Sequence, residues 1–299
     1  MRVKKLGEFG LIDLLSKRLK HSAEVMQGIG DDCAILPFDR KSFLLLTCDM
    51  LVEGIDFTLG DKPYLVGSKS IGCCLSDIAA CAGLPRYAQI SLGLSPNMSI
   101  SRVKQLYQGI IFQAKKFKVK IVGGDISQSD KLIIDVSLLG MVERKNLTKR
   151  SGAKKGDIIF VSGKLGGSIY RHHLTFTPRI KEARYLVGNY KINSMIDISD
   201  GLIQDLGHIL KQSDRGAIVY KDLIPLSADA HSFNQALFMG EDFELLFTLA
   251  PRQAKRLISS RKNKQFFPIG EIIDKAGGLV MLDKQARKMK LTSGGFKHF

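Results

Sequence analysis

Five short acidic segments, each beside a glycine or another small residue, constrain this chain more than any other feature of its sequence. They are Gly30-Asp31-Asp32, Thr47-Cys48-Asp49, Gly123-Gly124-Asp125, Asp197-Ile198-Ser199-Asp200-Gly201 and Gly240-Glu241-Asp242. A single Asp beside a Gly is most often a turn. Here the segments recur at the ends of predicted strands, and Asp77 adds a carboxylate inside a predicted helix. The pattern predicts that carboxylates from distant parts of the chain meet in one site.

Converging carboxylates predict a bound cation. Carboxylates that share a cleft repel one another at neutral pH unless cations lie among them, and hard oxygen ligands select Mg²⁺ or Ca²⁺. Mg²⁺ keeps several waters and completes its octahedron with phosphate oxygens of a substrate. The neighbouring glycines let backbone N–H groups approach those oxygens, because no Cβ is in the way. The pattern therefore predicts a magnesium site that handles phosphate.

The familiar nucleotide-binding motifs are absent from the sequence. It contains no G-x-x-x-x-G-K-[ST], and the segment from Gly163 to Ser168 is only superficially similar to one. The G-x-G-x-x-G pattern fails as well, because Gly28-Ile29-Gly30 is followed by Asp31. Protein-kinase signatures and the G-x-S-x-G elbow of hydrolases are also missing. A nucleotide site in this chain therefore uses aspartates rather than a P-loop.

The length and hydrophobic pattern predict two α/β (α+β) domains, each a mixed sheet with helices packed on one side. At 299 residues the chain exceeds the size that one core usually supports. A basic, glycine-containing stretch at 144–156 divides it into residues 1–143 and 144–299. Helices are predicted at Gly7–Leu19, Pro63–Ala82, Ser99–Phe117 and Leu202–Leu210. Strands are predicted at Phe43–Leu46, Tyr87–Leu94, Val119–Val122, Leu132–Val142, Asp157–Val161, Ser194–Ile198, Phe243–Leu249, Phe267–Ile273 and Gly278–Leu282.

The cysteines and the net charge limit the compartment and the partners that we expect for this chain. Five cysteines without a Cys-x-x-Cys, zinc spacing or secretory signal predict reduced, buried thiols in a cytoplasmic protein. No apolar run approaches the ~18 residues of a membrane helix. The net charge of +16 is compatible with a nucleic-acid partner, phosphorylated substrates or a basic proteome. The basic clusters lack aromatic interleaving, so we expect solvated faces, with no nucleic-acid and no membrane partner.

A set of motifs that spans both predicted domains in order resembles thiamine-monophosphate kinase, in the superfamily of aminoimidazole ribonucleotide synthetase. The motifs are Gly7-Glu8-Phe9, Gly28 to Asp32, Thr47 to Phe57, Leu75-Ser76-Asp77, Gly123-Gly124-Asp125, Arg150 to Ala153, Asp197 to Leu202, Gly240 to Leu245 and Lys297-His298-Phe299. The resemblance implies the two-domain fold of that superfamily, with metal binding, ATP binding and dimerisation in the N-terminal domain. It also implies a homodimer and Mg²⁺-dependent transfer of the ATP γ-phosphoryl group to thiamine monophosphate.

The resemblance also implies roles for individual residues. Several Mg²⁺ ions would be held by Asp32, Thr47, Cys48 through its backbone carbonyl, Asp49, Asp77, Asp125, Asp197 and Asp200. Of these, Asp49, Asp125 and Asp200 are the expected catalytic residues. ATP would contact Gly124, Asp125, Arg150 and Ser199. Thiamine monophosphate would contact Asp56, Glu241 and Phe296.

Several positions depart from the family pattern. Asp56 stands where a histidine is usual, so substrate placement is altered, or Asp56 faces the cationic thiazolium ring, or activity is reduced. Met239 replaces a glycine and Phe243 replaces a tyrosine. The stretch 167–192 is shorter than usual, so we expect helices over the nucleotide site to be missing.

Two other functions fit parts of the sequence. A sister enzyme of the superfamily could act on another phosphorylated or carboxylated metabolite, although the hydrogenase-maturation type ends in a cysteine motif and this chain ends in Gly-Gly-Phe-Lys-His-Phe. A non-enzymatic nucleic-acid-binding protein would account for the net charge of +16.

Overall fold

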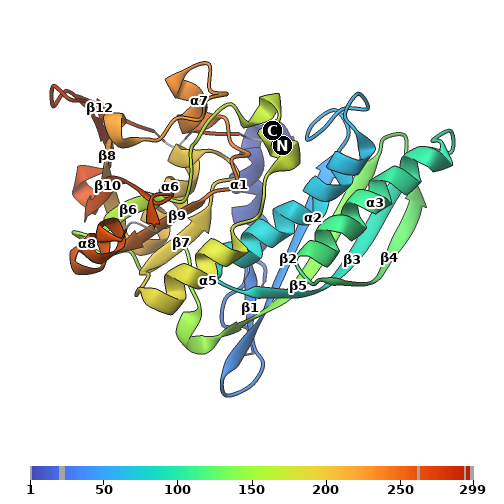
Figure 1. Cartoon of the computed structure of the whole chain (residues 1–299), viewed down its shortest axis with the longest axis horizontal. Helices are drawn as coiled ribbons and strands as arrows, with labels where there is room; N and C mark the ends of the chain where they lie inside the picture. Colours follow the sequence, from blue (N-terminus) through green and yellow to red (C-terminus); the bar gives the residue numbers. More distant parts are fainter. Residues whose placement is uncertain (1, 20–23, 261–262, 293, 297–299) are drawn as a thin grey trace.

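The chain folds into two mixed β-sheets with helices between and around them (Figure 1). The structure, a computed structural model, describes residues 2–19, 24–260, 263–292 and 294–296. The motif Lys297-His298-Phe299 lies outside the described residues. Over the described part, the strand orders are β1-β2-β5-β3-β4 and β12-β11-β8-β10-β6-β9-β7.

The first sheet is covered by helices on one face only. Its strands are β1 (Ala34–Pro37), β2 (Ser42–Val52), β3 (Leu84–Leu94), β4 (Lys120–Gln128) and β5 (Ile133–Glu143). Helices α2 (Pro63–Ala80) and α3 (Ile100–Lys116) lie over the same face (Figure 1). Side chains alternate along β2, so Leu45 is buried under these helices while Leu46 and Met50 are exposed on the other face. We call that exposed side the open face of the sheet.

The second sheet has helices on both faces. Its strands are β6 (Ile158–Val161), β7 (Ser194–Asp197), β8 (Arg215–Tyr220), β9 (Leu245–Leu249), β10 (Phe267–Asp274), β11 (Leu279–Leu282) and β12 (Lys288–Lys290). The other helices are α1 (Val3–Ser16), α4 (His172–Thr175), α5 (Ile180–Asn189), α6 (Leu202–Ser213), α7 (Phe233–Phe238) and α8 (Pro251–Ser259). In β9, Leu246 packs into a core with α6, whereas Phe247 packs into the core that contains α2 and α5. Helices therefore pack on one face of the first sheet, as expected. They pack on both faces of the second sheet, because one of its faces belongs to the core that the two halves share.

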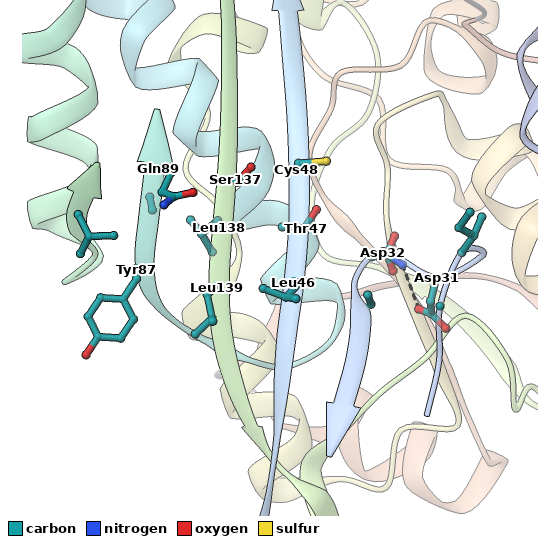
Figure 2. Close-up of a pocket in the computed structure, with 15 residues that line it drawn as sticks. Asp31, Asp32, Leu46, Thr47, Cys48, Tyr87, Gln89, Ser137, Leu138 and Leu139 are labelled. Carbon is teal, nitrogen blue, oxygen red and sulfur yellow. Dashed lines mark hydrogen bonds between the residues drawn. The ribbon is translucent and has the colours of Figure 1, made fainter. Parts of the chain in front are cut away.

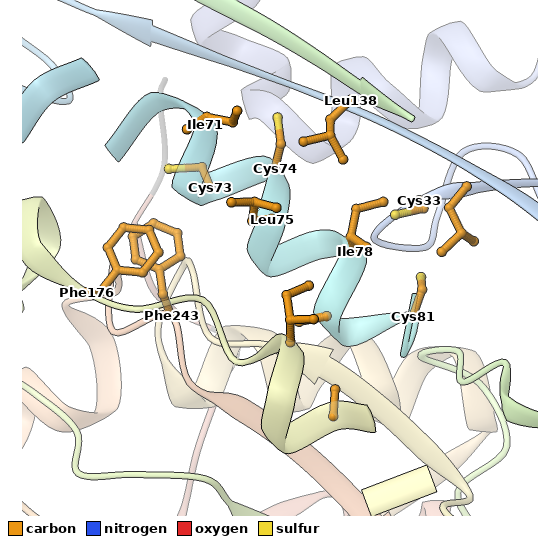
Figure 3. Close-up of a cluster of buried hydrophobic side chains, with 14 of the residues drawn as sticks. Cys33, Ile71, Cys73, Cys74, Leu75, Ile78, Cys81, Leu138, Phe176 and Phe243 are labelled. Carbon is orange, nitrogen blue, oxygen red and sulfur yellow. The ribbon is translucent and has the colours of Figure 1, made fainter. Parts of the chain in front are cut away.

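Helix α2 joins the two halves, since it is buried between them (Figure 3). On one side, the Cys74 thiol donates to the Val136 carbonyl oxygen of β5 at 3.1 Å. On the other side, Gly72 leaves room for the ring of Phe176, which stacks on Phe243 with ring centroids 4.0 Å apart. Small residues on α2 thus allow a β-sheet to pack closely on one side of the helix and an aromatic pair on the other.

The long apolar and helical patterns are confirmed. Predicted helices are observed at α1, α2, α3 and α6, and the Ser99 hydroxyl caps α3 by accepting the Arg102 N–H at 3.3 Å. Strands β1, β8 and β12 were not predicted, because each is short or lacks a clear alternation. The shortened stretch retains α4 and α5.

The ends of two strands were predicted wrongly. The segment Thr47-Cys48-Asp49 was expected just beyond a strand, but it lies inside β2, which runs on to Val52. The reason is continuous pairing with β5, from Ser42 opposite Glu143 to Val52 opposite Ile133. Gly123-Gly124-Asp125 likewise lies within β4.

The cysteines are free thiols and, with one exception, buried as the sequence predicts. All five cysteines are free thiols, and Cys33, Cys73, Cys74 and Cys81 are buried. Cys48 is exposed, which corrects its expected burial, because its side chain lies on the open face. Among the described residues, no helix combines the length and the apolarity needed to cross a bilayer.

Helices α2 and α3 touch backbone to backbone at two glycines, which yields a stability prediction. A Cβ on Gly67 would lie 2.0 Å from the Leu106 carbonyl oxygen, and one on Gly109 would lie 1.8 Å from that of Tyr64. We expect Gly109→Ala to lower the free energy of unfolding by about 3 kcal/mol or more, since the helices must separate. Urea unfolding monitored by circular dichroism measures this.

Gly188→Ala in α5 is the matched control, because a Cβ at Gly188 meets nothing within 4 Å. We expect it to leave stability unchanged or to raise it by up to about 1 kcal/mol, through helix propensity. Equal losses in the two variants would contradict backbone contact as the cause.

Candidate active site

A cleft of about 380 Å³ lies where β2 and α2 of the first half face the loops of the second half. Residues near both ends of the described chain reach it, namely Glu8 and Phe296. The residues predicted from the sequence that line it are Asp32, Thr47, Cys48, Asp49, Asp56, Asp77, Arg150, Ser199, Asp200, Glu241 and Phe296. Segments that are far apart in sequence thus share one cleft.

Three carboxylates meet at the base of this cleft. Asp32, just before β1, Asp77 on α2 and Asp197 at the end of β7 each offer an oxygen, and these oxygens lie within 4.8 Å of one another. The Thr47 hydroxyl donates to Asp77, and the Ser76 hydroxyl donates to Asp197 Oδ2 at 2.6 Å. We call Asp32, Asp77 and Asp197 the carboxylate cluster.

Arg150 anchors one side of the cluster. Its guanidinium donates to Asp32 Oδ1 from Nε at 3.1 Å and from Nη2 at 2.7 Å. Its backbone N–H lies 3.3 Å from both carboxylate oxygens of Asp31. The second oxygen of Asp32, Oδ2, is buried without a hydrogen-bond partner among the described residues. A buried carboxylate oxygen with no donor is suited to a cation ligand.

Burial raises the pKa values of these acids, and neighbouring carboxylates add to the effect. Burial and then the charge of Asp32 raise the pKa of Asp197 to about 8. Burial and the charges of Asp49 and Asp197 raise the pKa of Asp77 well above its usual value. The pKa of Asp32 is also raised by burial, although Arg150 opposes the shift. The cluster therefore lacks enough positive charge to ionise fully at neutral pH.

The oxygen atoms that the cluster could offer as ligands fit a hard divalent cation such as Mg²⁺. They are carboxylate oxygens, with the Thr47 hydroxyl beside them and the unpaired Asp32 Oδ2 among them. Such a cation would replace the missing positive charge and favour the ionised acids.

The loop after β7 and the helix that follows it, α6, hold a second group of polar residues. Asp205 on α6 accepts the backbone N–H groups of Asp200 and Gly201, each at 3.1 Å. Asp200, Asp205 and His208 place one ligand atom each within 4.8 Å of one another. Burial lowers the pKa of His208 to about 4. Asp205 and His208 were not predicted, although their i, i+3 spacing on a helix is a usable signal.

The segment 240–244 alternates between the cleft and the second half. Glu241 and Phe243 line the cleft. Asp242 accepts the Gly166 N–H at 2.9 Å, and Glu244 accepts the Ser162 hydroxyl at 2.6 Å. The buried acids between the cleft residues thus fix the segment to the second sheet.

A buried lysine, Lys69, contacts two residues of the cleft lining. It stands on α2 with 1% of its surface exposed. Its ammonium pairs with Glu241 and donates to the Asp56 carbonyl oxygen at 2.8 Å. The sequence analysis missed it, although it is the single charged side chain between Pro63 and Ser76.

Gly124 and Asp125 lie away from the cleft. They belong to β4 at the edge of the first sheet, and Asp125 is exposed. Three strand spacings separate β4 from β2, so Asp125 is ~14 Å from Asp49 across the sheet. The fold of a single chain therefore does not bring Asp125 to the carboxylate cluster.

Comparisons with known proteins place the chain in a class and in a family. Residues 30–142 match the model of the AIR synthase related protein N-terminal domain, and residues 149–283 match the corresponding C-terminal domain. Two domains in this order, with the cleft between them, define an AIR synthase related protein.

Closer relatives narrow the assignment. The thiamine-monophosphate kinase of Aquifex aeolicus (strain VF5) is 37% identical over 277 residues, which cover 83% of this chain and 87% of the relative. That of Escherichia coli (strain K12) is 32% identical, with 98% of each chain covered. The solved structure described as AaThiL complexed with AMPPCP and TMP is 34% identical, with a TM-score of 0.88 over 100% of this chain and 99% of that one. The chain belongs to the thiamine-monophosphate kinase family.

The raised pKa of Asp197 predicts a pH-dependent effect of Mg²⁺ on stability. The folded protein keeps a proton on Asp197 up to about pH 8, whereas the unfolded chain releases it near the usual value of 3.8. Stability from this group is therefore full below about pH 4 and is lost as the pH rises through about 8. Mg²⁺ binds the ionised acids, so at 100 times its dissociation constant it should restore about 2.7 kcal/mol at pH 8 and much less at pH 5.

Differential scanning fluorimetry across pH 5 to 9, with and without Mg²⁺, measures this effect. Asp197→Asn is the comparison variant, and we expect it to lose the part of the pH dependence that comes from Asp197. Equal Mg²⁺ stabilisation at both ends of the pH range would contradict the assignment.

Proposed function

We propose that this chain is a thiamine-phosphate kinase, which transfers the γ-phosphoryl group of ATP to thiamine monophosphate and yields thiamine diphosphate and ADP. The carboxylate cluster with its unpaired Asp32 oxygen carries the proposal, because Asp32 and Asp77 line the same cleft as Glu241 and Phe296. The named activity of the family members supports the substrate pair. We place the protein in the cytoplasm, consistent with its free thiols.

The acceptor needs no general base. A phosphate monoester has its second pKa near 6, so it is mostly ionised at pH 7. The reaction instead requires that two anions approach each other in line. This explains why the cleft carries aspartates and an arginine around the reacting groups, whereas the pKa of His208 is lowered to about 4 and leaves it neutral.

The residues of the chain divide into three groups. Asp32, Thr47, Cys48 through its carbonyl, Asp49, Asp77, Asp197 and Asp200 hold several Mg²⁺ ions. Bound Mg²⁺ neutralises the phosphate charge that builds up during transfer. Arg150 and Ser199 line the cleft and would contact ATP, while Asp49 and Asp200, which also line it, are the proposed catalytic residues. Glu241, Asp56 and Phe296 hold the thiamine end.

The kinase proposal predicts ADP release that depends on both Mg²⁺ and thiamine monophosphate. A coupled ADP assay measures it, and we expect Asp77→Asn to lower kcat/KM by about 100-fold or more, because the cluster loses a charge. Asp130→Asn, at an exposed aspartate outside the cleft, should keep full activity. ADP release no faster with thiamine monophosphate than with water alone would rule out the assignment, and a phosphorylated protein trapped during turnover would rule out direct transfer.

We also propose a homodimer in which two copies of the first sheet meet through their open faces. The open face is rich in apolar side chains, with Leu46, Tyr87 and Leu139 on neighbouring strands (Figure 2). Met50 is 57% exposed and Val122 58%, which adds to a large apolar area for a surface. A second copy of the same face would bury it, as two-fold dimers do.

The dimer gives a role to Asp125. Within its own protomer Asp125 is ~14 Å across the sheet from Asp49. It lies on exposed β4, at the edge of the open-face sheet. We propose that Gly124 and Asp125 complete the ATP and metal site of the partner subunit.

Mixed dimers test this arrangement. Asp77→Asn and Asp125→Asn homodimers should both be nearly inactive. Subunit exchange between them at equal amounts should restore about a quarter of wild-type activity, because half of the dimers then contain one intact site of two. No recovery in exchanged samples, with exchange verified by native mass spectrometry, would place Asp125 in its own subunit's site or outside the site.

A further inference from the structure

Three charged residues meet at the thiamine end of the cleft. Lys69 Nζ pairs with the Glu241 carboxylate and lies 2.8 Å from the Asp56 carbonyl oxygen. The Asp56 carboxylate accepts the Val52 N–H at 2.7 Å, which holds it on the tight turn after β2. Glu241 and Asp56 both line the cleft. We call Lys69, Glu241 and Asp56 the charge triad.

Lys69 acts through Glu241 rather than on the substrate. Its side chain is fully buried, while that of Glu241 is 27% exposed. A buried ammonium is stable only with a partner, so the pair is fixed by the high free energy of separating it. The partners lie on different halves of the molecule, 172 residues apart in sequence. Lys69 therefore aims Glu241 and ties the two walls of the cleft together.

The backbone at Glu241 supports this positioning role. Glu241 has a φ of 57°, in the left-handed region that non-glycine residues seldom occupy. Its N–H donates to the Ser199 carbonyl oxygen at 2.7 Å. Such a conformation persists when the surroundings hold it, and the Lys69 pair is one of the contacts that hold it.

The charges of the triad sum to one excess negative charge. Lys69 cancels the charge of Glu241, so the pair alone is neutral, and Asp56 supplies the remainder. The influence of Asp56 reaches into the cleft, because its charge is among those that raise the pKa of Asp49.

We infer that Asp56 is a specificity-determining residue and Lys69 a positioning residue, and that together with Glu241 they match this end of the cleft to a ligand ring with a single positive charge. The inference rests on the proposed function, because the thiazolium ring of thiamine monophosphate carries that charge. Of the three interpretations of Asp56 raised by its departure from the family pattern, this one has Asp56 facing the thiazolium.

A pair of ligands that differ only in ring charge tests the inference. They are thiamine monophosphate and the monophosphate of its thiophene isostere, whose ring is neutral. Dissociation constants are measured by calorimetry with Mg²⁺ and a non-hydrolysable ATP analogue present. We expect the wild-type protein to bind the cationic ligand about tenfold more tightly than the neutral one.

Variants of the triad then separate charge from structure. Asp56→Asn keeps an acceptor for the Val52 N–H but removes the charge, so the preference should fall to about one while the affinity for the neutral ligand stays constant. The double variant Lys69→Met with Asp56→Asn leaves Glu241 uncompensated, so the preference for the cation should return. Loss of affinity for both ligands alike, or no return in the double variant, would overturn the inference.

Asp61→Asn is the matched control. Asp61 accepts the Thr58 N–H at 2.7 Å, just as Asp56 accepts that of Val52, but Asp61 is not part of the cleft lining. Its variant should keep the wild-type preference. If the double variant fails to fold, Asp56→Asn alone decides, since an unchanged preference there overturns the inference.

The two proposals fail in different ways. A wild-type protein that converts thiamine monophosphate yet binds the two ligands equally would overturn the charge triad and leave the kinase in place. Absence of ADP release dependent on thiamine monophosphate would overturn the kinase instead.

Discussion

Mutual repulsion among buried carboxylates is the constraint on which the rest of this structure depends. Asp32, Asp77 and Asp197 come within 4.8 Å of one another in surroundings that raise the pKa of each. A fold keeps such a group together only if other interactions hold its members in place. Arg150 does so for Asp32 and the Ser76 hydroxyl for Asp197. The remaining charge imbalance supports the proposal that a divalent cation binds in the cleft.

Helix α2 carries charged residues of the cleft and also packs in the core of the protein. It carries Lys69, Cys73 and Asp77 at intervals of one helical turn, so one stripe places an ammonium beside Glu241 and a carboxylate in the carboxylate cluster. The two residues are separated by ~12 Å of helix axis, which is long enough to span an elongated phosphorylated substrate. The same helix packs into the core shared by both halves, so the stripe is rigid. Packing and catalysis thus rely on one element.

Much of this arrangement could be predicted from local sequence, and the remainder depends on contacts that local sequence does not encode. The apolar stripe of α2 and the acidic segments predicted the helix and the grouping of Asp32 with Asp77. Thr47 was misplaced relative to its strand because pairing with β5, a distant partner, decides where β2 ends. Lys69 was missed because its partner, Glu241, lies 172 residues away. The role proposed for Asp125 could not be read from local sequence, because it requires a second copy of the chain.

The alternation of segment 240–244 couples the evolution of specificity to that of folding. Asp242 and Glu244 bind the second half, whereas Glu241 and Phe243 face the cleft. Substitutions at positions 241 and 243 keep the anchors at 242 and 244 but still reach the rest of the fold, because Glu241 pairs with buried Lys69 and Phe243 stacks on Phe176. A change of ligand in a lineage with this architecture therefore requires compensating substitutions at Lys69 or Phe176.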